Sequence, residues 1–178
     1  MAAKLPTGLI MTTALAALLP LAACGGSDQP QAEATTTVAP RDEDGLTPDE
    51  REVADAVEAY TDAYFERGAT KVGPAIKDLV TQEVYDLIVP AETKSVDGAG
   101  LQHLGKVALT VDKVTIDDDT ALYRGCQDAS KSFLVRKGDT SPGVGSTTLG
   151  FTRMEYGLAR EDGVWVVSDP RSEQVASC

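Results

Sequence analysis

The chain has 178 residues, with 16 Lys and Arg against 28 Asp and Glu, one His, three Cys and a formal net charge of −12. This length predicts one domain with appendages, and a hydrophobic content of 42% is enough for one packed core. The acidic balance excludes the basic surface that a nucleic-acid partner requires. One His and three Cys without Cys-x-x-Cys spacing exclude a zinc or iron–sulfur framework, so we expect no metal and no cofactor.

The N-terminal residues have the pattern of a bacterial export signal. Lys4 supplies a positive charge, a short apolar stretch follows, and the stretch closes with Leu-Ala-Ala-Cys at Cys24. Prolines interrupt the stretch, and fewer than about 18 uninterrupted apolar residues do not span a bilayer. The Leu-Ala-Ala-Cys sequence resembles a lipobox, which implies a signal peptide over 1–23, cleavage before Cys24 and lipidation of its thiol. An ordinary secretory peptide that happens to contain a cysteine is the alternative.

Lipidation of Cys24 determines the expected location. Each buried CH₂ group contributes about 0.8 kcal/mol, and two acyl chains of the palmitate type anchor stably where one does not. We therefore expect a lipoprotein held on the extracytoplasmic face of the cell membrane. Residues 24–47 contain almost no large apolar side chains, so they are predicted to be the lipidated cysteine and a disordered acidic tether. The globular domain is then expected over 48–178.

The first half of this domain has helical patterns. Thr47–Glu50 forms a capping box with proline at the first helical position. Apolar side chains then recur on one helical face: Val53, Val57, Tyr60 and Tyr64. Gly68 is expected to end this helix. Two shorter helices follow, one opened by Pro74 and one capped by Thr81 with Pro90 beyond its end.

The second half alternates as strands do. Strands are predicted over Val107–Ile116 with a bulge near Asp112, and over Thr120–Cys126, Phe151–Arg160 and Val164–Val167, the last ended by Pro170. Asp117–Asp119 and Glu161–Gly163 are predicted hairpin turns, and 138–148 a long loop. Helices followed by antiparallel strands predict an α+β domain.

Two cysteines remain after lipidation of Cys24. In an oxidising compartment, a disulfide between Cys126 and Cys178 is expected. It would close a loop of about 53 residues and hold the C-terminal tail. Two free thiols, or pairing of Cys178 between molecules, are the alternatives.

Several short motifs resemble a known family. They are Gly125-Cys126-Gln127-Asp128, Asp162-Gly163-Val164-Trp165-Val166-Val167, the terminal Cys178, Ala59-Tyr60 and Asp78-Leu79-Val80-Thr81-Gln82-Glu83. They look like small secreted actinobacterial lipoproteins, which resemble the nuclear-transport-factor-two-like (SnoaL-like) superfamily. The resemblance implies three helices packed in the concave face of a strongly curved antiparallel sheet, a cone with a cavity at its wide end.

Few residues of the sequence are candidates for catalysis. His103 is the single histidine and lies in a Gly-flanked segment before the first expected strand, where surface or packing roles are commoner than general acid–base catalysis. Asp128 shares a strand face with Cys126, and it is expected either to cap a turn before Ser130 or to lie at the cavity mouth. No nucleophile triad, phosphate loop or paired carboxylates stand out, so no catalytic residue is assigned.

Three functions follow from this pattern. We favour a non-catalytic binding or accessory module of the cell envelope, anchored to the membrane through its lipid. In this role the cone-shaped cavity would hold a small apolar ligand. Five residues are expected to line the cavity, and the alternative is that they are only core residues: Tyr60, Tyr64, Tyr123, Met154 and Trp165. An acidic surface that docks an envelope protein is the second possibility. The third is a small-substrate enzyme of the SnoaL-like type, an isomerase or hydrolase that uses the cavity.

Overall fold

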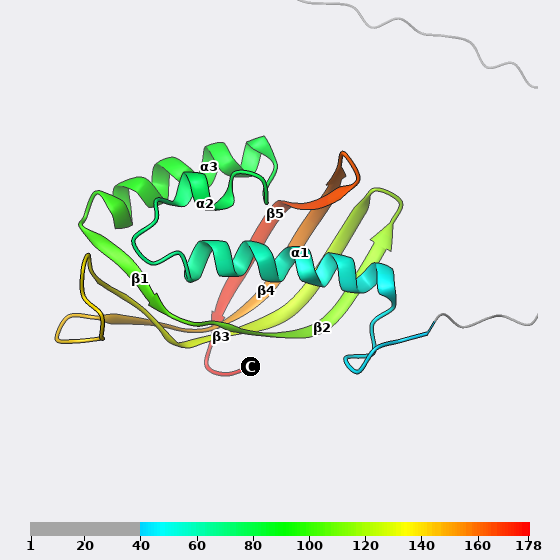
Figure 1. Cartoon of the computed structure of the whole chain (residues 1–178). Helices are drawn as coiled ribbons and strands as arrows, with labels where there is room; N and C mark the ends of the chain where they lie inside the picture. Colours follow the sequence, from blue (N-terminus) through cyan, green and yellow to red (C-terminus); the bar gives the residue numbers. More distant parts are fainter. Residues whose placement is uncertain (1–39) are drawn as a thin grey trace, which may run out of the picture. The chain divides into compact units, whose positions relative to one another are not determined.

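Helices precede strands along residues 40–178, the part of the chain that the computed structural model describes (Figure 1). The signal peptide, Cys24 and residues 25–39 of the predicted tether lie outside the described residues. The elements are α1 (Pro48–Phe65), α2 (Val72–Ile76), α3 (Gln82–Glu92), the π-helical segment η1 (Thr93–Asp97), β1 (Leu101–Gly105), β2 (Ala108–Asp117), β3 (Thr120–Arg136), β4 (Thr147–Glu161) and β5 (Val164–Val175).

The five strands form one antiparallel sheet with β3 as its longest strand. One edge of β3 pairs with β2 over 120–128 and with β1 over 132–136, and its other edge pairs with β4, which pairs with β5. The helices gather on one face of the curved sheet, with α1 crossing it (Figure 1). The predicted α+β fold, with N-terminal helices packed on a curved antiparallel sheet, is confirmed. None of the helices between residues 40 and 178 is long and apolar enough to cross a membrane.

The predicted local signals of α1 are present. The Thr47 hydroxyl accepts from the Glu50 amide, and the Glu50 carboxylate accepts from the Thr47 amide at 2.7 Å, which completes the capping box. Thr81 caps α3 with a single hydrogen bond, in which its hydroxyl accepts from the Val84 amide. Both two-residue hairpin turns are also found, with Asp118 and Asp162 at positive φ as such turns require.

Part of the segment predicted to be tether has a defined structure. Residues 42–47 form a turn in which the Asp42 carboxylate accepts from the Leu46 amide at 2.8 Å. Arg51 of α1 pairs with Asp42 at 2.6 Å and also with Asp44. Leu46 is buried in the core. One apolar side chain and a carboxylate at a turn are enough to hold this short segment on the start of α1, although its composition is polar.

Four boundaries differ from the sequence predictions. His103 lies in strand β1, where a loop was expected, and β3 runs to Arg136, well beyond Cys126. Pro90 lies inside the last turn of α3, and the chain continues as η1. Pro170 lies within β5 and does not end it. A proline is tolerated there because β5 is an edge strand, where a missing amide hydrogen need not break a ladder.

The core lies between the helices and the inner face of the sheet. Inward side chains of β3 and β4 meet in register, with Tyr123 opposite Tyr156 and Gly125 opposite Met154. Tyr123 is fully buried and its hydroxyl lies over Gly125. The bulge predicted near Asp112 is present in β2 between Val111 and Lys113, and it keeps apolar residues inward on both sides.

Gly125 is predicted to be essential to this packing. A Cβ at this position would lie 2.8 Å from the Tyr123 hydroxyl and would press on the Thr110 carbonyl oxygen. We expect Gly125→Ala to lower the free energy of unfolding by about 2 kcal/mol, because overpacking displaces the ring. Gly143→Ala is the matched control, since a Cβ there meets open space, and it should change stability by less than about 0.5 kcal/mol. Urea denaturation measures both, and equal midpoints would contradict the packing argument.

Candidate functional site

The five side chains expected to line a cavity lie in the core. Tyr60, Tyr123, Met154 and Trp165 are buried, and Tyr64 packs against them partly exposed. α1 lies directly on the sheet, and the Tyr60 ring meets the Tyr156 ring edge-on at 5.9 Å between centroids. These rings pack between α1 and the sheet as core residues. The expectation that they also line a ligand site stays a prediction from the sequence.

A buried charged cluster lies at the end of α1. Arg67 follows α1, Glu92 is the last residue of α3, and His103 is at the centre of β1. Arg67 Nη2 donates to Glu92 Oε1 at 2.7 Å, and His103 Nε2 lies 3.1 Å from the same oxygen. The rings of Tyr64 and Phe65 stand edge-on to His103 at 5.9 and 5.8 Å. One carboxylate oxygen of α3 thus connects the segment after α1 with strand β1.

The contacts of Glu92 set its charge. Burial raises the pKa of this carboxyl, but hydrogen bonds from His103, Arg67 and Tyr64 and the charge of Arg67 lower it more, to about 2. Glu92 is therefore a carboxylate that can only accept, so His103 must donate from Nε2. The Nδ1 atom is buried without a hydrogen-bond partner among the described residues. With 3% of its surface exposed, His103 is held as a packing residue.

Two hollows remain on the inner side of the sheet. One of about 410 Å³ lies between α1 and β2 and is lined in part by Tyr123. The other is smaller and lies beyond the end of α1. Its volume is about 240 Å³. Phe65, Leu149 and Tyr156 line it together with amide and hydroxyl groups from three strands, which are Gln127, Thr152, Ser172 and Gln174. The mixture of amides and hydroxyls is more polar than the apolar cavity that the sequence led us to expect.

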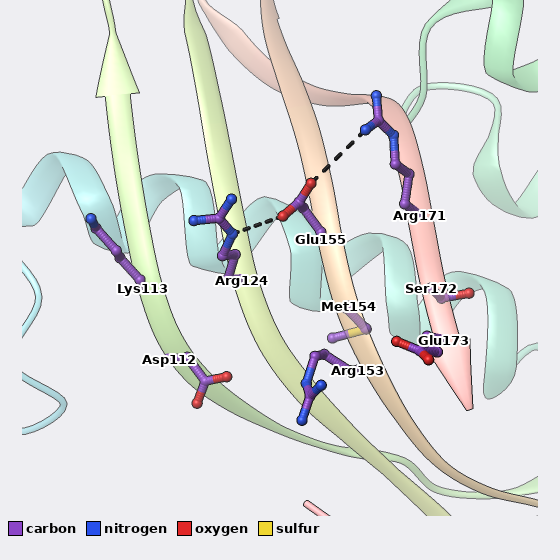
Figure 2. Close-up of a pocket in the computed structure, with 9 residues that line it drawn as sticks. All are labelled: Asp112, Lys113, Arg124, Arg153, Met154, Glu155, Arg171, Ser172 and Glu173. Atoms are coloured by element: carbon purple, nitrogen blue, oxygen red, sulfur yellow. Dashed lines mark hydrogen bonds and ion pairs between the residues drawn. The ribbon is translucent and has the colours of Figure 1, made fainter. Parts of the chain in front are cut away.

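A further hollow, of about 350 Å³, lies on the outer face of the sheet, which faces away from the helices (Figure 2). We call it the arginine pocket, and its lining residues come from β2, β3, β4 and β5: Asp112, Lys113, Arg124, Arg153, Met154, Glu155, Arg171, Ser172 and Glu173. Strand alternation explains it, because residues that neighbour inward core positions point outward. Four of its nine residues are basic on a chain that is acidic overall.

Register lines these charges up across the sheet. Lys113 is opposite Arg124, Arg124 is opposite Glu155, and Glu155 is opposite Arg171. Arg124 donates to Glu155 at 2.8 Å, and Arg171 lies 4.0 Å from the other oxygen of that carboxylate. In Figure 2 both guanidinium groups turn toward Glu155, whereas Arg153 points away from them. Within residues 40–178, neither Lys113 nor Arg153 has a carboxylate at ion-pair distance.

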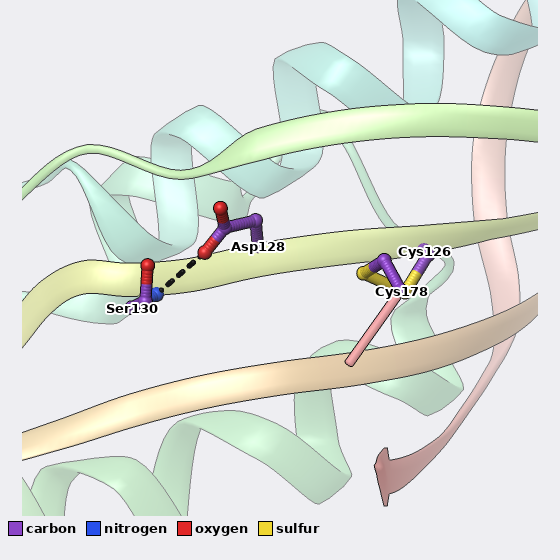
Figure 3. Close-up of a disulfide and its surroundings, with 4 residues drawn as sticks. All are labelled: Cys126, Asp128, Ser130 and Cys178. Atoms are coloured by element: carbon purple, nitrogen blue, oxygen red, sulfur yellow. Dashed lines mark hydrogen bonds between the residues drawn. A yellow bond between two sulfur atoms is a disulfide. The ribbon is translucent and has the colours of Figure 1, made fainter. Parts of the chain in front are cut away.

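The disulfide lies on the same outer face of the sheet, because Cys126 follows Arg124 by two residues on β3. Cys126 and Cys178 are joined, with their Cα atoms 5.7 Å apart, and the bond closes a loop with a sequence separation of 52 residues (Figure 3). On the chain-entropy argument such a loop contributes about 4 kcal/mol. Asp128 lies further along β3, where its carboxylate accepts from the Ser130 amide at 2.9 Å. The side-chain and backbone hydrogen bonds from Ser130 lower the pKa of Asp128, so this residue caps an irregular point of β3.

Sequence reasoning missed both the buried cluster and the arginine pocket. Arg67 and Glu92 are 25 residues apart, and only the helix packing brings them together. The outward positions of Arg124, Arg153 and Arg171 follow from strand alternation, but their convergence depends on the register between β3, β4 and β5. Among residues 40–178, no His, Cys, Asp and Glu side chains group as a metal site would require.

No protein-family model matches the chain, and no curated protein is similar to it. Solved structures share its fold. The intermembrane-space region of the chloroplast protein ARC6 matches with a TM-score of 0.55 at 14% identity, over 73% of this chain and 100% of that one. An NTF-2-like protein of unknown function from Shewanella oneidensis MR-1 matches with a TM-score of 0.46 at 14% identity, over 70% and 98%.

A third similar structure is an LEH-like epoxide hydrolase from M. tuberculosis, with a TM-score of 0.33 at 11% identity over 70% of this chain and 82% of that one. Proteins described as having a cystatin-like fold are also among the matches. The similarity to the ARC6 region shows a shared fold alone. Function therefore has to be argued from the residues of this chain.

Glu92→Gln tests the buried cluster. The replacement leaves Arg67 without its counter-charge, so we expect a loss of about 3 kcal/mol in the free energy of unfolding at pH 7. A carboxyl whose pKa falls from 4.5 in the unfolded chain to about 2 in the folded one stabilises above pH 4.5 and loses that contribution as pH falls toward 2. The wild type should therefore lose this stability in that window, and Glu92→Gln should not.

The control for this experiment is Glu83→Gln, an exposed carboxylate in the first turn of the same helix. It should change stability by about 0.5 kcal/mol or less and keep the wild-type pH profile. Chemical denaturation between pH 2 and pH 7 measures both variants. A Glu92→Gln protein with wild-type stability and an unchanged acid profile would show that the cluster does not hold the helices.

Proposed function

We propose that the chain is a lipid-anchored, extracytoplasmic binding module of the cell envelope that does not act as a catalyst. The observation that carries this proposal is the contrast between the two faces of the sheet. Core side chains pack on the inner face around two hollows, and Arg51, the basic residue that lines the larger of them, is paired with Asp42 and Asp44. The outer face instead has an open pocket with Lys113 and Arg153, which have no carboxylate of residues 40–178 at ion-pair distance. A basic binding surface outside the packed core fits a carrier or receptor module better than an enzyme.

Support for the location comes from the cysteines. Cys24 ends the lipobox-like sequence, and the other two cysteines are joined by a disulfide, as is common in exported proteins and rare in reducing compartments. The tether would separate the acidic domain from an anionic membrane surface by like-charge repulsion. Every cysteine of the chain thus has a use in an exported lipoprotein.

A second candidate function is a small-substrate hydrolase or isomerase of the SnoaL-like type. The hydrogen bond between Glu92 and His103 favours it, because a carboxylate that orients a histidine is a common arrangement in acid–base catalysis. We place it second because His103 is buried and its bonded nitrogen is already used by Glu92.

Cys24→Ser tests the anchor. Without the thiol no thioether to diacylglycerol can form, so the protein should leave the membrane fraction, and mass spectrometry should find no lipid on its N-terminal peptide. In the wild type that peptide should begin at Cys24 and have the added mass of a diacylglycerol. Ser27→Ala is the nearby control and should remain in the membrane fraction. A Cys24→Ser protein that stays membrane-bound at wild-type levels would contradict the proposed anchor.

Native mass spectrometry tests the binding role. We expect the full-length protein, extracted from its own membrane in a non-ionic detergent, to show a population with a noncovalently bound small molecule. The adduct should disappear when the protein is unfolded and refolded without lipid extract. A chain that shows one unliganded mass in repeated native extractions would argue against a binding module.

A further inference from the structure

The arginine pocket contains an arrangement of charges that stability alone does not favour. Lys113 and Arg124 are directly opposite each other on neighbouring strands, and like charges in that position destabilise a sheet. Arg153 adds a third cation two register positions away on the same face, opposite Glu173 but beyond ion-pair distance of any carboxylate within residues 40–178. In Figure 2 Lys113 and Arg153 extend away from each other, and an anion between them would draw both side chains back toward Arg124.

The arginine pocket has a net positive charge, whereas the whole chain has a net negative charge. The full sequence has 28 acidic and 16 basic residues, whereas the pocket has four basic and three acidic side chains. One of the acids, Glu155, is already shared between Arg124 and Arg171. The remaining cations, Lys113 and Arg153, are therefore available to an outside ligand.

We propose that the arginine pocket binds the phosphate group of a polyol phosphate, with Arg153 and Lys113 as the principal contacts and Arg124 beside them. This inference rests on the proposed function, because it names the ligand class of that binding module. A guanidinium presents two parallel N–H donors that match two phosphate oxygens, and an ammonium adds a compact second charge. Two free cations match the two negative charges of a phosphate monoester.

The remaining lining residues indicate what the phosphate is attached to. The carboxylates of Asp112 and Glu173 lie around the same hollow and can accept hydrogen bonds from hydroxyl groups. The volume of about 350 Å³ exceeds what one phosphate fills and is within the range of small-molecule sites. A glycerol or sugar phosphate supplies both the anion and the hydroxyl groups. Its source can be a soluble metabolite or the headgroup of a membrane phospholipid.

Binding should be measured on the full-length protein in non-ionic detergent by isothermal titration calorimetry. The probes are glycerol 3-phosphate and, as a partner without phosphate, glycerol. We expect saturable binding of glycerol 3-phosphate and none of glycerol at concentrations up to about 10 mM. Arg153→Gln and Lys113→Gln should each weaken binding about tenfold, the effect of losing one charge-assisted hydrogen bond. Arg136→Gln, an exposed arginine of β3 outside the pocket, should stay within about twofold of wild type.

A second arm separates the two sources. Vesicles of phosphatidylglycerol and vesicles of phosphatidylcholine are tested for co-flotation with the Cys24→Ser protein, which lacks the proposed anchor. Flotation with phosphatidylglycerol that Arg153→Gln abolishes would assign the headgroup, and binding of glycerol 3-phosphate without flotation would assign a soluble ligand. Both outcomes support the site.

Three results would overturn the inference: no binding of either probe, wild-type affinity in both pocket variants, or an equal loss in Arg136→Gln. Failure of the proposed function is distinguishable from these results. If glycerol 3-phosphate binds through Arg153 and is then hydrolysed, the site stands and the non-catalytic role falls. If Cys24 is unlipidated while binding remains, the site stands and the anchor falls.

Discussion

The carboxylate of Glu92 connects parts of the domain that no strand pairing joins. Its Oε1 atom accepts from Arg67 after α1 and from His103 on β1, and Glu92 itself ends α3. A charge at this depth is tolerated because its partners are close and charged, and removing one of them would leave another buried charge uncompensated. We therefore expect the positions of α1 and α3 over the sheet to depend in part on this contact.

The packing of the inner face limits the space left for a ligand there. Tyr60, Tyr123 and Tyr156 pack between α1 and the sheet, and hollows remain beside this packing. Strand alternation gives the opposite face a separate set of side chains, and these are polar and charged. The two faces therefore differ in character: core packing dominates the inner face, and the proposed binding site lies on the outer one.

The overall acidity of the chain and the basic character of the arginine pocket act over different distances. At physiological ionic strength, exposed charges are screened beyond about 8 Å, so an anion at the pocket responds mainly to Arg153, Lys113 and their immediate neighbours. The net charge of −12 instead governs the approach to other acidic surfaces. On the proposed anchor and ligand, the negative net charge would act on the approach of the whole domain to a membrane, and the arginine pocket on the phosphate group alone.

Local features were accessible from the sequence. The capping box at Thr47–Glu50, the cap at Thr81, the two hairpin turns, the bulge near Asp112 and the α+β class each depend on residues within a few positions of one another. The pairing of Cys126 with Cys178 followed from the count of cysteines once Cys24 was given another use. The lipid anchor itself remains a prediction from the sequence.

Tertiary structure decided what depends on distant residues. Pro170 lies within β5 because that strand is an edge, which a local pattern cannot reveal. His103 became part of a buried cluster because α3 delivers Glu92 to it, and the expected cavity residues became core because α1 lies flat on the sheet. The arginine pocket exists because register places Arg124, Glu155 and Arg171 in one row across three strands. Each strand fixes which of its side chains point outward, but only the pairing of strands decides which charges meet.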